Sequence, residues 1–139
     1  MFKLQKVKLL IGEIYSDEKI SALAESELRN KYGEIEFKSE IIDFNFTSYY
    51  EKETGTGLKR KWISFKDMIE PGAIAEIKNN TNLIEEKFSQ NGNRKINLDP
   101  GYITGSSLIL ASTKNYSHRI YLKDGIYAEV TLLFEHKNW

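Results

Sequence analysis

The sequence predicts one α+β domain over residues 1–139, with a ferredoxin-like β-α-β-β-α-β antiparallel sheet and helices on one face. Residues 20–28 and 74–88 repeat apolar side chains at helical spacing. Short β-branched or alternating segments lie before, between and after them. An Asp-Gly pair near the C-terminus marks an added β-hairpin. The order of these segments is the order that this fold class requires.

Residues 7–33 predict the first strand and the first helix. Residues 7–14 are apolar and β-branched, as in a buried strand. Ser16 is the predicted N-terminal cap of the helix, and the acids Asp17 and Glu18 favour the positive end of the helix dipole. Gly33 is predicted to end the helix because glycine readily adopts the left-handed conformation found there.

Two strands joined by a long loop are predicted next. Residues 35–41 alternate apolar and polar side chains, and from Ile42 the alternation continues one residue out of phase. This slip predicts a bulge near residues 41 and 42. Residues 48–57 are polar and predict a loop of a length that often carries function. Residues 59–65 predict the return strand.

A second helix is predicted after Pro71, with an apolar stripe along residues 74–88. Residues 89–93 predict a turn, and residues 94–98 predict a short strand. Asp99, Pro100 and Gly101 are residues typical of turns, and a turn is predicted there. Residues 108–111 predict another buried strand.

The C-terminal hairpin allows two loop lengths, and the side chains favour one of them. With a three-residue loop at residues 123–125, Arg119 lies opposite Glu129 and Tyr121 lies opposite Tyr127. This register separates apolar from polar side chains, whereas a two-residue loop mixes them. The predicted core face carries Ile120, Leu122, Ile126, Ala128, Val130, Leu132 and Phe134, and the predicted outer face carries Ser117, Arg119, Tyr121, Tyr127, Glu129 and Thr131.

The composition disfavours several classes of protein. Lysine plus arginine and aspartate plus glutamate both number 20, so the basic excess typical of generic nucleic-acid binding is missing. No cysteine is present, which excludes disulfides, thiolate metal sites and cysteine nucleophiles and fits a reducing compartment. The sequence carries neither a membrane-spanning stretch nor a signal-peptide cleavage site. We therefore expect a soluble cytoplasmic protein.

The outer face of the hairpin has two interpretations. It is either a solvated strand face with an ordinary cross-strand ion pair, or a ligand platform on which Glu129 holds Arg119 as an anion clamp. In the second interpretation, the residues expected to bind the ligand are Arg119, Tyr121, Tyr127, Glu129, Thr47, Tyr49, Tyr50, Lys59, Arg60, Asp99, Tyr102, Thr104, Ser117 and His118.

Several single residues also have two interpretations. The hairpin register turns His118 toward the edge of the core, where it is a structural residue or a ligand-binding one. Asp99 fixes a turn, or it is a magnesium ligand or general base. The candidates for catalytic carboxylates are Asp43, Asp99 and Glu129. The basic run at residues 59–61 is a solvated strand end or a phosphate contact.

Residues 97–104 (NLDPGYIT), 116–122 (YSHRIYL) and 125–132 (GIYAEVTL) resemble an uncharacterised prokaryotic family, the domain of unknown function 4416. Asp43-Phe44, residues 47–50 and the helix over residues 78–88 share the resemblance, which covers nearly the whole chain. Some members of the family carry an automatic label of GTP-binding protein. An aromatic, proline-containing tail usually follows in the family, and this sequence stops at Trp139 before it.

The residues do not support the GTP label. A phosphate-binding loop requires G-x-x-x-x-G-K-[ST], and the nearest stretch, residues 55–59 (GTGLK), has the wrong spacing and is followed by Arg60. A guanine-reading motif would need aspartate at Gly33. No cofactor is identified, although magnesium is compatible with the candidate carboxylates.

Three functions remain open. The first is binding of a small anionic or nucleotide-like ligand on the open sheet face. The second is a metal-assisted phosphoester hydrolase that acts on such a ligand. The third is a protein–protein interaction module whose open sheet face packs against another subunit, and a homo-oligomer is one form that this would take.

Overall fold

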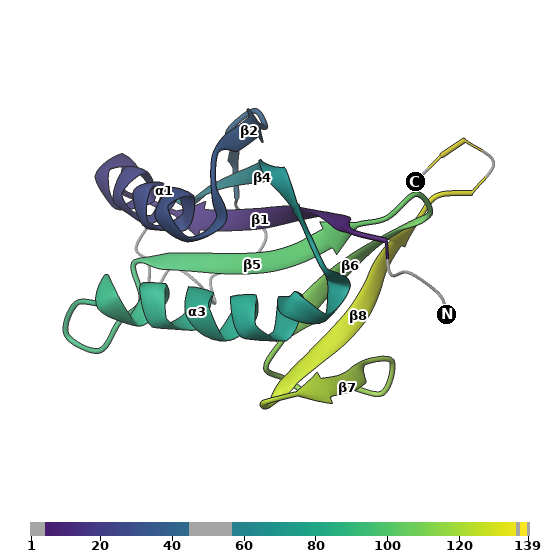
Figure 1. The fold of residues 1–139 in the computed structure, drawn as a ribbon. Coiled ribbons are helices and arrows are strands. Elements are labelled where there is room, and N and C mark those ends of the chain that lie inside the picture. Colours follow the sequence, from purple (N-terminus) through teal and green to yellow (C-terminus); the bar gives the residue numbers. More distant parts are fainter. Residues whose placement is uncertain (1–4, 45–56, 136, 139) are drawn as a thin grey trace.

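The computed structural model describes residues 5–44, 57–135, 137 and 138. In this part of the chain, one antiparallel sheet of eight strands packs against two α-helices (Figure 1). The predicted α+β class with an antiparallel sheet is therefore confirmed. The elements are β1 (Val7–Tyr15), α1 (Glu18–Tyr32), β2 (Ile35–Lys38), β3 (Ile42–Asp43), β4 (Lys59–Ile69), a 3-10 turn (Pro71–Ala73), α3 (Ile74–Lys87), β5 (Ile96–Ile103), β6 (Ser107–Ser112), β7 (Ile120–Lys123) and β8 (Ile126–Leu133).

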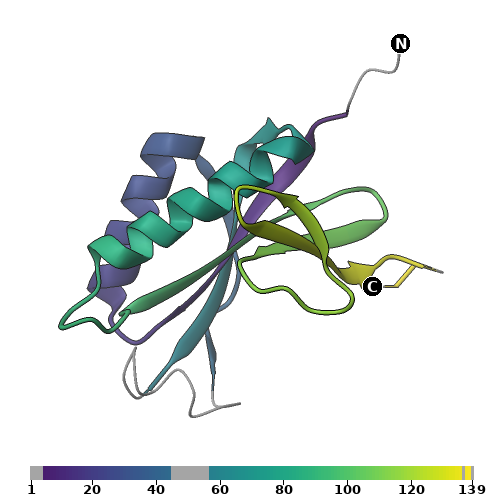
Figure 2. The same cartoon turned by 90° about the horizontal axis from the view of Figure 1, so that it is seen from below.

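The strands follow the order β2-β4-β1-β5-β6-β8-β7, and β3 also pairs with β4. This order differs from that of a four-stranded ferredoxin-like sheet, because β6, β8 and β7 extend the sheet beyond β5. The two helices lie side by side (Figure 2), and Asn80 of α3 donates a hydrogen bond to the Tyr32 hydroxyl of α1 over 3.0 Å. Leu9 and Ile11 of β1 belong to one buried hydrophobic cluster that also includes residues of both helices.

The start and end of α1 have separate local causes. The N-cap is Asp17, whose Oδ1 accepts a hydrogen bond from the backbone N–H of Lys19 over 2.8 Å. The prediction of Ser16 as the cap was therefore wrong by one residue. Gly33, at φ 95°, ends the helix as predicted, and its N–H donates to the carbonyl of Arg29.

A change in alternation was predicted after residue 41. In the structure the strand pairing is interrupted between β2 and β3, and both of these strands pair with β4. Ser39 bridges this interruption, because its N–H donates to the Trp62 carbonyl and its Oγ accepts from the Trp62 N–H, each over 2.8 Å. The return strand is longer than predicted and runs to Ile69. Most of the predicted loop at residues 48–57, with Tyr49 and Tyr50, lies outside the described residues, as does Thr47.

The predicted turn at residues 99–101 is wrong, because β5 runs straight through it. Asp99 pairs with Gly12, Pro100 with Ile11, and Gly101 with Leu10 of β1. Proline has no N–H and cannot donate to a second neighbouring strand. The pairing of β5 with β6 accordingly spans Gly101 to Ile103 and does not reach Pro100.

The predicted hairpin pairing is correct away from the turn, but the predicted turn is wrong. Ile120 pairs with Ala128, and Tyr121 pairs with Tyr127. However, the loop is the two-residue pair Asp124-Gly125, with φ values of 53° and 80°, and Lys123 pairs with Ile126. An irregularity at Leu122 restores the predicted register by absorbing one residue.

The predicted core face of the hairpin is also wrong for most of its side chains. Ile126 is fully buried, whereas Ile120 is 66% exposed and Val130 is 52% exposed. Leu122, Leu132 and Phe134 are exposed as well. Alternation along a strand shows which side chains share a face, but it does not show which face another layer covers.

None of the described helices is long and apolar enough to cross a membrane.

Candidate functional site

The divergence of β6 from β5 at Pro100 leaves one edge of β5 without a neighbouring strand at Leu98. Side chains of α3 satisfy this edge. The N–H of Leu98 donates to Oε2 of Glu85 over 2.6 Å, and the Leu98 carbonyl accepts from Nζ of Lys78 over 3.1 Å. Buried backbone polar groups need such partners, so these two helix side chains allow the sheet to split here.

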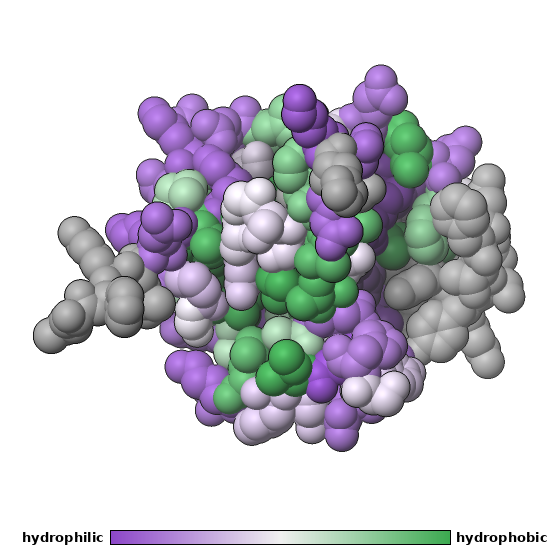
Figure 3. Space-filling view, turned by 90° about the vertical axis from the view of Figure 1, so that its right-hand side faces the viewer, coloured by the Kyte–Doolittle hydropathy of each residue, from purple (hydrophilic) through white to green (hydrophobic). Residues whose placement is uncertain are grey.

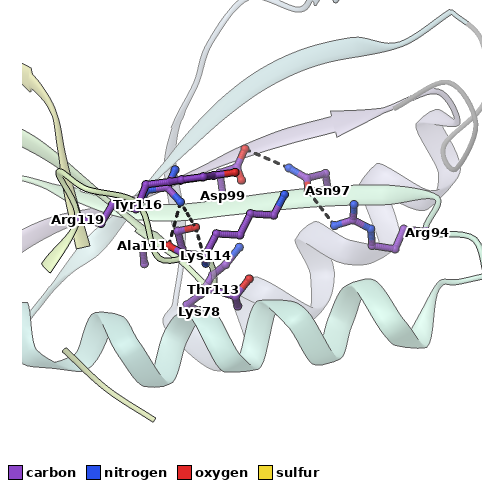
Figure 4. Close-up of a pocket in the computed structure, with 10 residues that line it drawn as sticks. Lys78, Arg94, Asn97, Asp99, Ala111, Thr113, Lys114, Tyr116 and Arg119 are labelled. Carbon is purple, nitrogen blue, oxygen red and sulfur yellow. Dashed lines mark hydrogen bonds between the residues drawn. The ribbon is translucent and has the colours of Figure 1, made fainter. Parts of the chain in front are cut away.

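The split holds a cavity of about 290 Å³, which we call the wedge cavity (Figure 4). Its lining comes from α3, from β5 and the turn before it, from the end of β6 and from the segment that leads to β7. The lining residues are Lys78, Arg94, Asn97, Asp99, Ala111, Ser112, Thr113, Lys114, Tyr116 and Arg119.

Arg119 is fixed at the wall of the wedge cavity by neighbours on several segments. Its Nε donates to Oε1 of Glu129 over 3.2 Å, as the hairpin register predicted. Its Nη1 donates to Oγ of Ser112 over 2.9 Å and to the carbonyl of Lys114 over 3.0 Å. The guanidinium also lies 4.6 Å from the centre of the Tyr116 ring. The side chain is therefore held in one orientation before any ligand arrives.

Asp99 is held by two donors on the strand face. Its Oδ2 accepts from Nη1 of Arg60 over 3.0 Å and from Nδ2 of Asn97 over 3.1 Å. Arg60 in turn stacks 4.2 Å from the centre of the Trp62 ring, above the position where Gly12 has no side chain. Asp99 therefore joins an ion pair and does not fix a turn.

Arg94 reaches the other end of the wedge cavity. Its Nη1 donates to Oδ1 of Asn97 over 3.2 Å and lies 3.7 Å from Oε1 of Glu85. Burial raises the pKa of Glu85, although Lys78, the N–H of Leu98 and Arg94 oppose this shift. Burial therefore favours the neutral form of Glu85, the carboxyl group next to Arg94.

The charged side chains that line the wedge cavity favour an anion, although Glu85 and Glu129 beside them offset part of the positive charge. Lys78, Arg94, Lys114 and Arg119 line it, and Asp99 is the one carboxylate among the described lining residues. Asp99 is already paired with Arg60. Arginine and lysine side chains that converge on a partly buried space suit oxyanions, because both form charge-assisted hydrogen bonds. Water screens these hydrogen bonds less in such a space than on the open surface.

The structure brings together some of the predicted ligand residues and separates others. Arg119 and Asp99 line the wedge cavity, and Glu129 lies behind Arg119. Tyr121 and Tyr102 line a different cavity, next to Pro71 and the start of α3. Tyr127 contacts Tyr121 edge to face, with ring centres 5.2 Å apart. Arg119 and Glu129, like Tyr121 and Tyr127, therefore face each other across the hairpin as predicted, but Arg119 and Tyr121 line different cavities.

His118 also differs from its predicted place at the edge of the core. Its side chain is 70% exposed, and its Nε2 lies 2.7 Å from Oε1 of Glu129. The same carboxylate oxygen accepts from Arg119. His118 is thus connected to the wedge cavity through Glu129.

The remaining predicted ligand residues lie apart from the wedge cavity or support it from behind. Lys59 pairs with Glu18 over 3.2 Å, and Arg60 pairs with Asp99. Thr104 bonds within its own turn to Ser107, and Ser117 is exposed in the turn before Arg119. The basic run at residues 59–61 is not one phosphate contact, because its side chains have three different partners.

The candidate catalytic carboxylates lie on three different strands. Asp43 pairs with Lys59 in the β3–β4 ladder, whereas Asp99 and Glu129 belong to β5 and β8. The described residues contain no group of three or more histidine, aspartate or glutamate side chains that could hold a metal ion.

Sequence reasoning missed eight of the residues that line the wedge cavity, namely Lys78, Arg94, Asn97, Ala111, Ser112, Thr113, Lys114 and Tyr116. A signal existed for Lys78, since it lies one helical turn after Ile74 and next to Ile77 in the apolar stripe of α3. The structure buries it. A buried lysine needs a specific partner. No pattern pointed to the others, because their meeting depends on where β5 and β6 diverge.

A separate polar network is buried between β1, β4 and α1. Oγ of Ser21 donates to Oε1 of Glu13 over 2.6 Å, and Nζ of Lys61 lies 2.6 Å from Oε2 of Glu25. Burial, together with the neighbouring Glu25, raises the pKa of Glu13 to about 8. Burial opposes ionisation of Glu25 as well, but hydrogen bonds with Glu13, Lys38 and Lys61 lower its pKa to about 2.

Comparison with known proteins gives one match. The model of a family described as "Domain of unknown function (DUF4416)" matches residues 5–139. No curated protein and no solved structure matches the chain.

Proposed function

The chain belongs to the family described as domain of unknown function (DUF4416), and we propose that it binds a small anionic ligand, such as a phosphate or nucleotide-like compound, in the wedge cavity. One observation carries this proposal. Lys78, Arg94, Lys114 and Arg119 come from separate segments and line the same space. Like charges repel, so an arrangement that gathers them is stabilised when an anion occupies the space between them.

The fixed orientation of Arg119 supports the same proposal. Its Nε and Nη1 are used by Glu129, Ser112 and Lys114, which hold the guanidinium in place. A side chain that is already ordered loses little conformational entropy when a ligand binds. An oxyanion that meets it therefore gains charge-assisted hydrogen bonds at a small ordering cost.

The proposal is tested by thermal unfolding in the presence of sulfate, phosphate and a nucleoside triphosphate. Ligands that bind the folded state raise the melting temperature. We expect a concentration-dependent rise for the wild type and none for Arg119→Ala. The matched control is Arg29→Ala, which removes the same side chain from an exposed position on α1. Equal responses of wild type and Arg119→Ala would refute the site.

A second candidate function is self-association through the exposed apolar side chains of β7 and β8. Ile120, Val130, Leu132 and Leu133 are each at least 45% exposed. Figure 3 shows apolar side chains gathered on the side of the molecule that lies to the right in Figure 1. Sedimentation over a range of protein concentrations tests this function. A monomer at every concentration would exclude it.

We also propose that β1, β2, β4 and β5 form a ferredoxin-like core. The order β2-β4-β1-β5 supports this proposal, as does the antiparallel pairing of each neighbouring pair. A solved structure of a relative that aligns these four strands and both helices with a ferredoxin-like protein would test it.

A further inference from the structure

We infer that protonation of His118 strengthens the binding of anions in the wedge cavity, so that ligand affinity rises as the pH falls. This inference rests on the proposed function. Its structural basis is a single carboxylate oxygen. Oε1 of Glu129 lies 2.7 Å from Nε2 of His118 and 3.2 Å from Nε of Arg119.

The charge of Glu129 opposes anion binding when His118 is neutral. Glu129 is then paired with Arg119 alone and cancels part of the positive charge that the cavity wall offers a ligand. A protonated His118 forms a second ion pair with the same oxygen. It adds one positive charge beside Arg119, and the field at the cavity becomes more positive.

The position of His118 suits this role. Its side chain is 70% exposed, so protons reach it freely, while the side chain of Arg119 is 16% exposed. Histidine is the residue type that ordinarily changes charge between pH 5 and 8. The charged side chains near His118 are Glu129 from β8 and Arg119 from the segment of His118 itself. The same segment contains Lys114, which lines the cavity.

Glu85, which lies 3.7 Å from Arg94, is a second group whose protonation would affect an anion in the wedge cavity. Burial raises its pKa, and its protonation would also favour an anion. Its contribution is the same whether or not His118 is present. The difference between the wild type and a His118 variant therefore isolates the effect of the histidine.

Calorimetric titration with sulfate at constant ionic strength tests the inference, because sulfate keeps its two negative charges from pH 5.5 to pH 8. We expect the affinity of the wild type to rise on the order of fivefold from pH 8 to pH 5.5, as expected for one charge a few ångströms from a divalent ligand near water. The variant His118→Gln keeps a neutral hydrogen-bonding group beside Glu129 and should lose most of this rise. The variant His118→Arg should bind at pH 8 about as tightly as the wild type binds at pH 5.5.

The outcomes separate this inference from the proposed function. If the wild type and His118→Gln show the same rise, the inference is overturned while the anion site stands. If sulfate binds neither protein at either pH, the proposed function fails as well. Since His118 is exposed, both variants are expected to fold, which a matching unfolding temperature without sulfate would confirm.

Discussion

Arg119 and Glu129 face each other across the β7–β8 hairpin, and the Nε to Oε1 distance of 3.2 Å joins them in a partly buried ion pair. Glu129 fixes one edge of the guanidinium, and Ser112 and the Lys114 carbonyl fix another. The planar fork of arginine is required for this arrangement, since lysine offers one compact charge.

The variant Arg119→Lys should therefore weaken sulfate binding although it keeps the charge. We expect a loss of about tenfold in affinity, which corresponds to about 1.4 kcal/mol. Calorimetric titration measures it. Arg29→Lys, on the exposed side of α1, is the matched control and should bind as the wild type does. An unchanged affinity for Arg119→Lys would show that charge alone matters.

The variant Lys78→Met should lower the stability of the folded protein and also its affinity for sulfate, since Lys78 lines the wedge cavity. Nζ of Lys78 satisfies the carbonyl of Leu98 at the free edge of β5, and methionine leaves this carbonyl unpaired. The expected cost is about 1–3 kcal/mol in the free energy of unfolding, measured with urea. Lys87→Met, at an exposed position on the same helix, should change it by less than about 1 kcal/mol. Equal effects of the two variants would contradict the capping role of Lys78.

The variant Gly101→Ala should destabilise the protein strongly. An added Cβ would collide with the carbonyl oxygen of Ile109 on β6 and lie 2.7 Å from Cδ2 of Leu110. Backbone cannot move aside without breaking the β5–β6 ladder, so we expect a loss of several kcal/mol. Gly105→Ala is the control, since no atom lies within 4 Å of a Cβ there. Circular dichroism during thermal unfolding measures both, and similar melting temperatures would argue against close strand contact at Gly101.

The variant Glu13→Gln should change how stability depends on pH. The pKa of Glu13 is about 8 in the folded state and 4.5 ordinarily, so between these values the folded state holds a proton that the unfolded state has released. The free energy of unfolding therefore falls as the pH rises through this range, by up to a few kcal/mol. Glutamine has no proton to lose, and its variant should be the more stable protein at pH 8.

Urea unfolding at pH 5, 6.5 and 8 measures this difference. Glu40→Gln, at an exposed position, should follow the wild type at every pH. Parallel profiles for Glu13→Gln and the wild type would mean that Glu13 is ionised when folded.

Much of the fold could be predicted because its signals are local. The apolar stripe of α3 and the glycine that ends α1 act within a few residues, and the structure bears out both. The pairing of Tyr121 with Tyr127 was also predictable, since the alternation of side chains specifies which residues share a face. The candidate site was less predictable. Of the residues that the sequence suggested, Arg119 and Asp99 line the wedge cavity and Glu129 contacts Arg119, whereas Tyr102 and Tyr121 line a different cavity and Lys59 pairs with Glu18.

The sequence by itself determined the helices, most strands and the partner of Arg119, because each depends on neighbours in the chain or directly across a hairpin. The tertiary structure alone decided that Asp99, Pro100 and Gly101 lie within a strand. Eight residues of β1 pair with eight residues of β5, and this pairing outweighs the local preference of these three residues for a turn. It also decided where β6 leaves β5, and thereby which cations meet. That meeting depends on contacts between segments far apart in the chain, and no local pattern encodes it.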